Sequence, residues 1–255
     1  MMDPRVAAVE ENLFAWRRIF LDVDGVQNCS APDVQACSSP VPSHLFNGVC
    51  EARFDDWGSR AQEVADTFVA RGLPWFWWVT PTTTSPELEG VLHRHGMTRM
   101  DVPGMHLDLD GWEPAPAPAG VELVAGSPDE AESVDTLLRA FGLPAASRGP
   151  LMAHATAFAR ANTFSVFARV DGQAVAGGLG LVAEETVGLY VVATLEEFRG
   201  RGIGGAVTEA LLAEGKAHGA RHAILHTTPM GRPVYERIGF AEVCPTAQYV
   251  WMPRA

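Results

Sequence analysis

Three consecutive segments near the middle of the second half of the chain are composed mainly of apolar residues and are separated by short polar turns. These segments cover residues 164–170, 173–182 and 186–192. Short apolar segments bounded by turn residues are typical of β-strands. Asp171-Gly172 joins the first two segments as a tight hairpin, and Glu184-Glu185 separates the second from the third. We therefore expect an antiparallel meander here and not a β-α-β unit.

Helical periodicity surrounds this meander. Ser127-Pro-Asp-Glu has the composition of a helix start, and apolar residues follow it at helical spacing from Val134 to Phe141. After the meander, the pattern predicts a glycine-rich loop with a helix over 202–217, then a strand, a short helix and a final strand. We place these last three elements at residues 222–226, 229–237 and 248–252.

The first part of the chain has a similar order of elements. We expect strands at 18–23, 49–54, 75–80 and 106–109, and helices at 61–70 and 85–93. Residues 88–97 match residues 231–240 in pattern, with Gly96 in the position of Gly239, while Phe54 and Gly58 match Phe198 and Gly202. This weak self-similarity suggests a tandem repeat of one α+β fold.

A proline-alanine segment from Glu113 to Gly120 divides the two repeats. Such a segment forms a stiff, extended linker. We therefore expect a first domain at 1–113, a linker at 114–120 and a second domain at 121–255. In the first domain, Trp75-Phe-Trp-Trp78 would alternate between the two faces of a strand, either as core or as the lining of a substrate groove between the domains.

Length, composition and charge agree with two globular domains. The chain has 255 residues, of which 47% are hydrophobic and 20% charged, with a net charge of −12. Residues 1–113 hold 8 Arg and 17 Asp or Glu, a net of −9, whereas the remainder holds 11 Lys or Arg and 14 Asp or Glu, a net of −3. Negative charge disfavours a nucleic-acid partner.

We expect no membrane segment and a cytoplasmic protein, because no long apolar run or signal sequence is present. Cysteines 29, 37, 50 and 244 have no zinc spacing, so we expect reduced thiols and no metal.

The most informative segment is the glycine-rich loop Glu197-Phe-Arg-Gly-Arg-Gly-Ile-Gly-Gly-Ala206. Glycines before a helix allow a ligand to approach the backbone N–H groups, and Arg199 and Arg201 can pair with phosphate oxygens. The alternative is a purely structural turn. The pattern Gly200-x-Gly202-x-x-Gly205 also satisfies a dinucleotide fingerprint, but the hairpin-linked strands before it and the short chain after it disfavour a Rossmann unit. A nicotinamide-dependent protein remains a weaker hypothesis.

Two motifs resemble the GCN5-related N-acetyltransferase (GNAT) family. Its coenzyme A loop, Arg/Gln-x-x-Gly-x-Gly/Ala, is similar to Arg199-Gly-Arg-Gly202-Ile-Gly204, and its Tyr-x-x-x-Gly-Phe helix is similar to Tyr235-Glu-Arg-Ile-Gly-Phe240. The resemblance covers residues 121–255. The first half of the chain resembles the same fold only in outline. It implies tandem GNAT-like domains with mixed central sheets, and an acetyl-CoA-dependent N-acetyltransferase that uses a small-molecule or peptide amine as a monomer or homodimer. A non-catalytic acyl-CoA-binding sensor or scaffold is the alternative.

The same resemblance implies roles for individual residues. Backbone groups of Val192, Ala193 and Thr194 would hold the pantetheine arm and the acyl carbonyl, with the Val192 N–H stabilising the oxyanion. Tyr235 would be the general acid, and Thr228 stands where the family often has an asparagine that contacts the cofactor. The pyrophosphate would be held by the loop residues Arg199, Gly200, Arg201, Gly202, Ile203, Gly204 and Gly205.

The general base is less well determined. Glu196 follows the third meander strand and is our first candidate, with Glu197 beside it, although both fit a solvated loop. His226 is a rival at a strand end, and Tyr190 would line the acceptor pocket or pack in the core. In the first half, Asp55-Asp56-Trp-Gly-Ser-Arg60 stands where the loop should be and Leu92 replaces Tyr235. We expect this half to be degenerate, because carboxylates repel a pyrophosphate.

Overall fold

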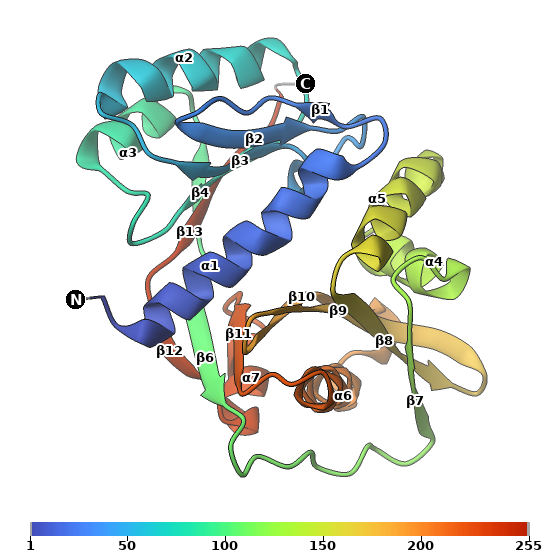
Figure 1. Ribbon diagram of the computed structural model, residues 1–255. Helices are drawn as coiled ribbons and strands as arrows, with labels where there is room; N and C mark the ends of the chain where they lie inside the picture. The colour runs from blue at the N-terminus through green and yellow to red at the C-terminus, as the bar shows by residue number, and fades with distance from the viewer. Residues whose placement is uncertain (1, 254–255) are drawn as a thin grey trace.

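A computed structural model describes residues 2–253 and contains two mixed β-sheets with helices on their faces (Figure 1). The first sheet has the strand order β1-β2-β3-β4-β13-β5. Its strands are β1 (Gln27–Asn28), β2 (Val34–Ser38), β3 (Gly48–Ala52), β4 (Trp75–Val79), β5 (Thr98–Asp101) and β13 (Ala247–Trp251). Helices α2 (Trp57–Ala70) and α3 (Pro86–Arg94) pack on its outer face, where Trp75 and Trp77 are fully buried.

The second sheet has the strand order β12-β6-β11-β10-β9-β8-β7. Its strands are β6 (Gly104–Asp108), β7 (Val121–Gly126), β8 (Thr163–Val170), β9 (Gln173–Ala183), β10 (Thr186–Thr194), β11 (His222–His226) and β12 (Ala241–Cys244). Helix α6 (Ile203–Ala217) packs on one face, and α4 (Ala131–Ala140) and α5 (Arg148–Arg160) pack on the other. Helix α7 (Arg232–Ile238) lies beside α6.

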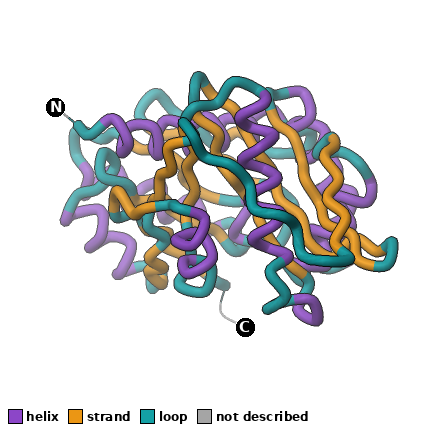
Figure 2. The backbone as a smooth tube through the Cα atoms, turned by 90° about the horizontal axis from the view of Figure 1, so that it is seen from below, coloured by secondary structure: helices purple, strands orange, loops and turns teal. Residues whose placement is uncertain are grey.

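Helix α1 (Pro4–Ile19) fills the space between the two sheets (Figures 1 and 2). Its Trp16 ring stacks on Phe158 of α5 and on Tyr190 of β10, at centroid distances of 4.3 and 4.2 Å. Phe76 and Trp78, on the inner face of β4, join the same core. The aromatic run of β4 is therefore buried on both faces, as alternation in a covered strand requires.

The two sheets exchange strands across the linker. Strand β6 precedes the linker but pairs with β11 and β12, while β13, from the end of the chain, pairs with β4 and β5. The predicted strand at 106–109 therefore exists, but in the second sheet. Met105 and Leu107 are buried in the core under α6, so the alternation of β6 is satisfied there. As a result, the boundary between the two sheets does not coincide with the linker in the sequence.

Most predicted elements of the second half are confirmed, but the expected strand at 18–23 is wrong. Residues 4–19 form α1, and residues 20–22 form a short 3₁₀-helix. Asp3 caps α1 by accepting a hydrogen bond from the Arg5 backbone N–H, and Pro4 occupies the first turn. The helical periodicity is obscured because the buried face includes the polar residues Glu10, Asn12 and Arg17.

Candidate active site

The glycine-rich loop forms the N-terminus of α6. Gly200 and Gly202 have φ angles of 75° and 78°, in the left-handed region that favours glycine. Gly202 is the N-cap, and its carbonyl accepts the first helical hydrogen bond from Ala206. The N–H groups of the first turn, which begins at Ile203, have no acceptor within the helix, so this end of α6 can bind an anion.

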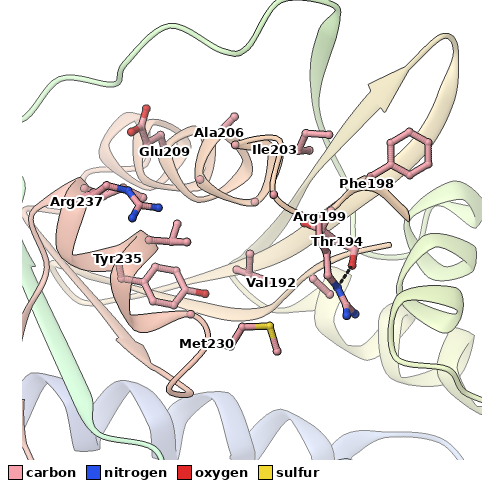
Figure 3. A pocket seen from close by; sticks show the side chains of 18 of the residues that line it. Val192, Thr194, Phe198, Arg199, Ile203, Ala206, Glu209, Met230, Tyr235 and Arg237 are labelled. Atoms are coloured by element: carbon pink, nitrogen blue, oxygen red, sulfur yellow. Dashed lines mark hydrogen bonds between the residues drawn. The ribbon is translucent and has the colours of Figure 1, made fainter. Parts of the chain in front are cut away.

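A cavity of about 690 Å³ opens over this loop, between α6, α7 and β10 (Figure 3). Arg199 lies at its edge, where its Nε donates to the Thr194 carbonyl at 3.2 Å. The proline-alanine linker forms another wall, and Ala115 N donates to Glu209 Oε2 at 2.7 Å. The predicted cofactor residues that line this cavity are Val192, Ala193, Thr194, Arg199, Gly200, Gly202, Ile203, Gly204, Gly205 and Thr228.

Arg201 is the predicted cofactor residue that does not line the cavity. Its guanidinium lies over the Phe198 ring at 4.9 Å, and Nη2 donates to the Glu197 carbonyl at 2.9 Å. The Arg201 side chain therefore stabilises the turn before α6. Only the backbone of Arg201 belongs to the part of the loop that can face a ligand.

A bulge in β10 shapes the inner end of this cavity. Val191 has a φ of 49°, which is rare for a β-branched residue. Tyr190 pairs with Leu179 and Ala193 with Gly177, so Val191 and Val192 together face Gly178. A Cβ on Gly178 would lie 2.9 Å from Val192 Cγ2, so the bulge needs glycine there. Beyond Leu189, which pairs with Leu225, β10 and β11 are no longer paired.

A second cavity of about 320 Å³ begins where these strands separate and extends between the two sheets. Residues of α1 and β4 form one wall, and residues of α5, β10 and β11 form the other. Val192, Thr228 and Tyr235 line both cavities, so the two cavities meet at these residues. This junction is where a group bound in one cavity could react with a group bound in the other.

Tyr235 of α7 lies at this junction, and its hydroxyl points toward Val192 (Figure 3). The side chain is half-buried, and burial raises the pKa of the phenol above its usual value. The hydroxyl therefore keeps its proton at neutral pH. This is the state that a general acid needs.

No carboxylate lines the second cavity among residues 2–253. Glu196 is exposed on the turn Glu196–Phe198 and lines neither cavity, and Glu197 is exposed 3.9 Å from Arg139. His226 does line the second cavity, with its ring 4.8 Å from that of Trp78. Burial lowers the pKa of His226 to about 4, and Nε2 has no hydrogen-bond partner among the described residues.

Tyr190 lines the second cavity and also packs in the core, so both expected roles apply to one side chain. Its hydroxyl donates to Asn12 Oδ1 at 2.7 Å. Burial raises its pKa well above the usual value, so this phenol remains a hydrogen-bond donor. Sequence reasoning missed the contribution of α1 to this cavity, because that helix was not predicted.

The corresponding region of the first half has no such site. Asp56 caps α2 by accepting a hydrogen bond from Ser59 N at 3.1 Å, and this bond lowers the pKa of Asp56. A carboxylate of the chain itself thus occupies the place of a bound anion. Leu92 is fully buried in the outer core. Within residues 2–253 we find no group of three metal-ligating side chains, and no helix there is long and apolar enough to cross a membrane.

Comparison with protein families identifies the second half. Residues 132–252 match the model of the acetyltransferase (GNAT) domain. Residues 132–252 form a GNAT domain. Among curated proteins no sequence matches the chain.

Solved structures extend the GNAT fold over the whole chain. A GCN5-related N-acetyltransferase from Kribbella flavida has a TM-score of 0.69 at 18% identity, with 97% of this chain and 96% of that chain covered. A GCN5-related N-acetyltransferase from Sphaerobacter thermophilus has a TM-score of 0.65 at 17% identity, covering 87% and 76%. A tandem GNAT protein from the clavulanic acid biosynthesis pathway has a TM-score of 0.59 at 15% identity, covering 87% and 79%. The architecture is therefore a GNAT tandem, in which each sheet includes a strand from the other half.

Proposed function

We propose that this protein transfers an acetyl group from acetyl-CoA to a primary amine, and that it does so in the cytoplasm. The observation that carries the proposal is the junction of two cavities at Val192 and Tyr235. One cavity has the composition of an anion and pantetheine site, and the other, which meets it at these residues, has mainly apolar walls. The four cysteines are free thiols, in agreement with a reducing compartment.

The residues of the larger cavity fit coenzyme A. Gly204 and Gly205 add no side chains to the first turn of α6, and a Cβ on Gly204 would lie 3.2 Å from Thr194 Oγ1. The free N–H groups of this turn and the guanidinium of Arg199 suit a pyrophosphate. Val192, Ala193 and Thr194 are placed to bind the pantetheine arm through their backbone groups.

When bound, acetyl-CoA supplies the acyl carbon that the amine attacks. Val192 has no partner in the β9–β10 ladder, and its N–H is the group we assign to the developing oxyanion. The Tyr235 hydroxyl gives its proton to the departing sulfur and recovers one from the nitrogen that has formed the new amide bond. Its raised pKa keeps this proton available.

The chain provides no carboxylate base in the second cavity, and we propose that the cavity itself favours the reactive form of the amine. Transfer of an ammonium ion into an apolar site lowers its pKa, because the charged form loses its hydration. The neutral imidazole of His226 can then accept a hydrogen bond from the amine and orient it. On this proposal Glu196 is not required as the base, since it lies outside both cavities.

Two measurements on the intact chain test the function. Acetyl-CoA should raise the melting temperature, and a primary amine should then cause release of free thiol, followed with a thiol-reactive dye. NADH should give no stabilisation, which would separate this function from a nicotinamide-dependent one. Binding of acetyl-CoA without thiol release across a broad panel of amines would instead support the sensor or scaffold.

A further inference from the structure

Arg17 of α1 is a buried cation without a carboxylate partner. Its residue is 6% exposed, and no carboxylate of residues 2–253 lies within ion-pair distance of its guanidinium. Its Nη1 donates to the Leu45 carbonyl at 3.2 Å and its Nε contacts Cys50 Sγ at 3.3 Å. Nη2 is buried and has no partner among the described residues.

Two aromatic rings fix the position of this guanidinium. Its central carbon lies 4.0 Å from the centroid of Phe20 and 4.4 Å from that of Phe76. These contacts favour a cation but do not satisfy its N–H groups. Burial of an arginine without a full set of acceptors is costly, so the arrangement calls for an explanation.

Cys50 compensates this charge only in part. Burial opposes ionisation of its thiol, but the hydrogen bond with Cys37 and the charge of Arg17 lower the pKa of Cys50 to about 6. The Cys50 sulfur contacts the guanidinium at Nε, at 3.3 Å. Among residues 2–253 no acceptor lies within hydrogen-bond distance of Nη2, so this group is free for an acceptor from outside the chain.

Arg17 lines the second cavity together with His44. The other end of this cavity is the reaction junction, with Tyr235 and His226. The walls between the two ends are aromatic and aliphatic, and they include Trp16 and Trp78. The cavity thus has a fixed cation at one end, the acyl-transfer groups at the other and an apolar middle.

We propose that the acceptor is a primary amine with a carboxylate at the opposite end of an apolar, aromatic body, and that Arg17 binds this carboxylate. This inference rests on the proposed acetyl transfer and names its substrate class. Arg17 and His226 contact different rings of β4, so an α-amino acid, with its amine and carboxylate on one carbon, fits this arrangement less well. Phe76 contacts Arg17 and Trp78 contacts His226, and these two rings are 6.4 Å apart.

The volume and the walls of the cavity support a single aromatic ring as the body. A cavity of about 320 Å³ is at the lower end of the range for ligand pockets. Stacking on Trp16 and Trp78 would favour a flat ring. A charge-assisted hydrogen bond from Arg17 to the carboxylate would fix the ring with its amine toward Tyr235.

The test is a comparison of amines that differ at one end. 4-(2-Aminoethyl)benzoate, tyramine and 2-phenylethylamine are titrated into the full chain without acetyl-CoA, and binding is followed by fluorescence of the cavity tryptophans. We expect the benzoate to bind at least tenfold more tightly than either neutral amine, since hydrogen bonds to charged groups are the stronger ones. Phenylalanine, which carries amine and carboxylate on one carbon, should bind more weakly than the benzoate.

Arg17→Gln should remove this preference, and Arg17→Lys should reduce it, because lysine keeps the charge but loses the planar fork. Arg18→Gln is the matched control, since Arg18 is the adjacent arginine and its side chain is 54% exposed. If Arg17→Gln does not fold, the amine series on the unaltered chain and on Arg17→Lys still decides the matter.

Several results would overturn the inference. Equal binding of the charged and neutral amines, no binding of any of them, or an unchanged preference in both Arg17 variants would each do so. Displacement of the amines by hexanoyl-CoA but not by acetyl-CoA would show that the cavity holds an acyl chain. Failure of the proposed acetyl transfer would look different from failure of this inference. In that case the benzoate would still bind in an Arg17-dependent way, but no thiol would be released from acetyl-CoA.

Discussion

Asn12 of α1 and Tyr190 of β10 are joined by a hydrogen bond of 2.7 Å, although they are 178 residues apart. Asn12 also donates to the Thr186 carbonyl at 3.0 Å, and the absence of a side chain at Gly188 makes room for it. These contacts hold α1 against the GNAT domain. They thereby set the positions of Trp16 and Arg17 in the second cavity.

Replacement of Asn12 by alanine should lower the free energy of unfolding by about 2–4 kcal/mol. The buried Thr186 carbonyl and Tyr190 hydroxyl would lose their partner, and each unpaired buried group costs about 1–3 kcal/mol. Urea unfolding measures the change. The exposed Asn28, which only accepts a local bond from Ser30 N, provides the control, and Asn28→Ala should cost less than half as much. A neutral effect of Asn12→Ala would show that the contact does not hold the two halves.

Tyr235→Phe should lower kcat by about 10²-fold or more, as expected for loss of a general acid. Affinity for acetyl-CoA should change little, because the ring is kept. Steady-state thiol release and thermal stabilisation by acetyl-CoA separate these two quantities. Tyr249→Phe makes the same chemical change in the first sheet, next to Arg99, and should leave kcat unaltered. An unchanged kcat in Tyr235→Phe would assign the proton to another group.

Gly202→Glu should abolish stabilisation by acetyl-CoA. The substitution places a carboxylate at the N-terminus of α6 and forces a side chain into a left-handed backbone conformation. Gly219→Glu is the matched control, because Gly219 has a φ of 92° near the other end of α6 and does not line the cavity. Both variants should lose some stability, but only Gly202→Glu should lose coenzyme binding. Retained binding in Gly202→Glu would contradict the loop assignment.

Cleavage of the linker within residues 114–117 should not separate the two halves. Strand β6 lies between β11 and β12, and β13 lies between β4 and β5, so each fragment supplies an internal strand to the other sheet. After cleavage at an introduced protease site, the fragments should co-elute in size-exclusion chromatography and part only in denaturant. Independent elution under native conditions would show that the strand exchange does not hold.

Acid should destabilise the protein through its buried histidines. Burial lowers the pKa of His154 to about 4, below the 6.5 of an unperturbed histidine, so the unfolded chain binds the proton more tightly. The contribution of neutral His154 to the free energy of unfolding is therefore complete above pH 6.5. About 3 kcal/mol of this free energy is lost as the pH falls toward 4.

His154→Gln should reduce this pH dependence, measured as the urea midpoint between pH 7 and pH 4. His218→Gln should leave it unchanged, because the His218 side chain is 43% exposed. Identical pH profiles for His154→Gln and the unaltered chain would show that His154 does not resist protonation.

The sequence by itself determined the elements of the GNAT half and its glycine-rich loop. Strands β8, β9 and β10 are short, mainly apolar segments joined by short turns, and the glycines before α6 are needed for a backbone conformation that is local. The predicted boundary at residues 114–120 rests on composition alone. No other part of the chain had to be known for these inferences.

Tertiary structure alone decided the partners of β6 and β13, the position of α1 and the existence of the second cavity. A strand with alternating apolar residues fits any sheet edge that covers its apolar face, so pattern cannot say which sheet it joins. The buried face of α1 contains Asn12 and Arg17, which look like surface residues until their partners in distant strands are known. Burial of polar groups depends on contacts made across the whole chain, and that is why the second cavity could not be derived from the sequence.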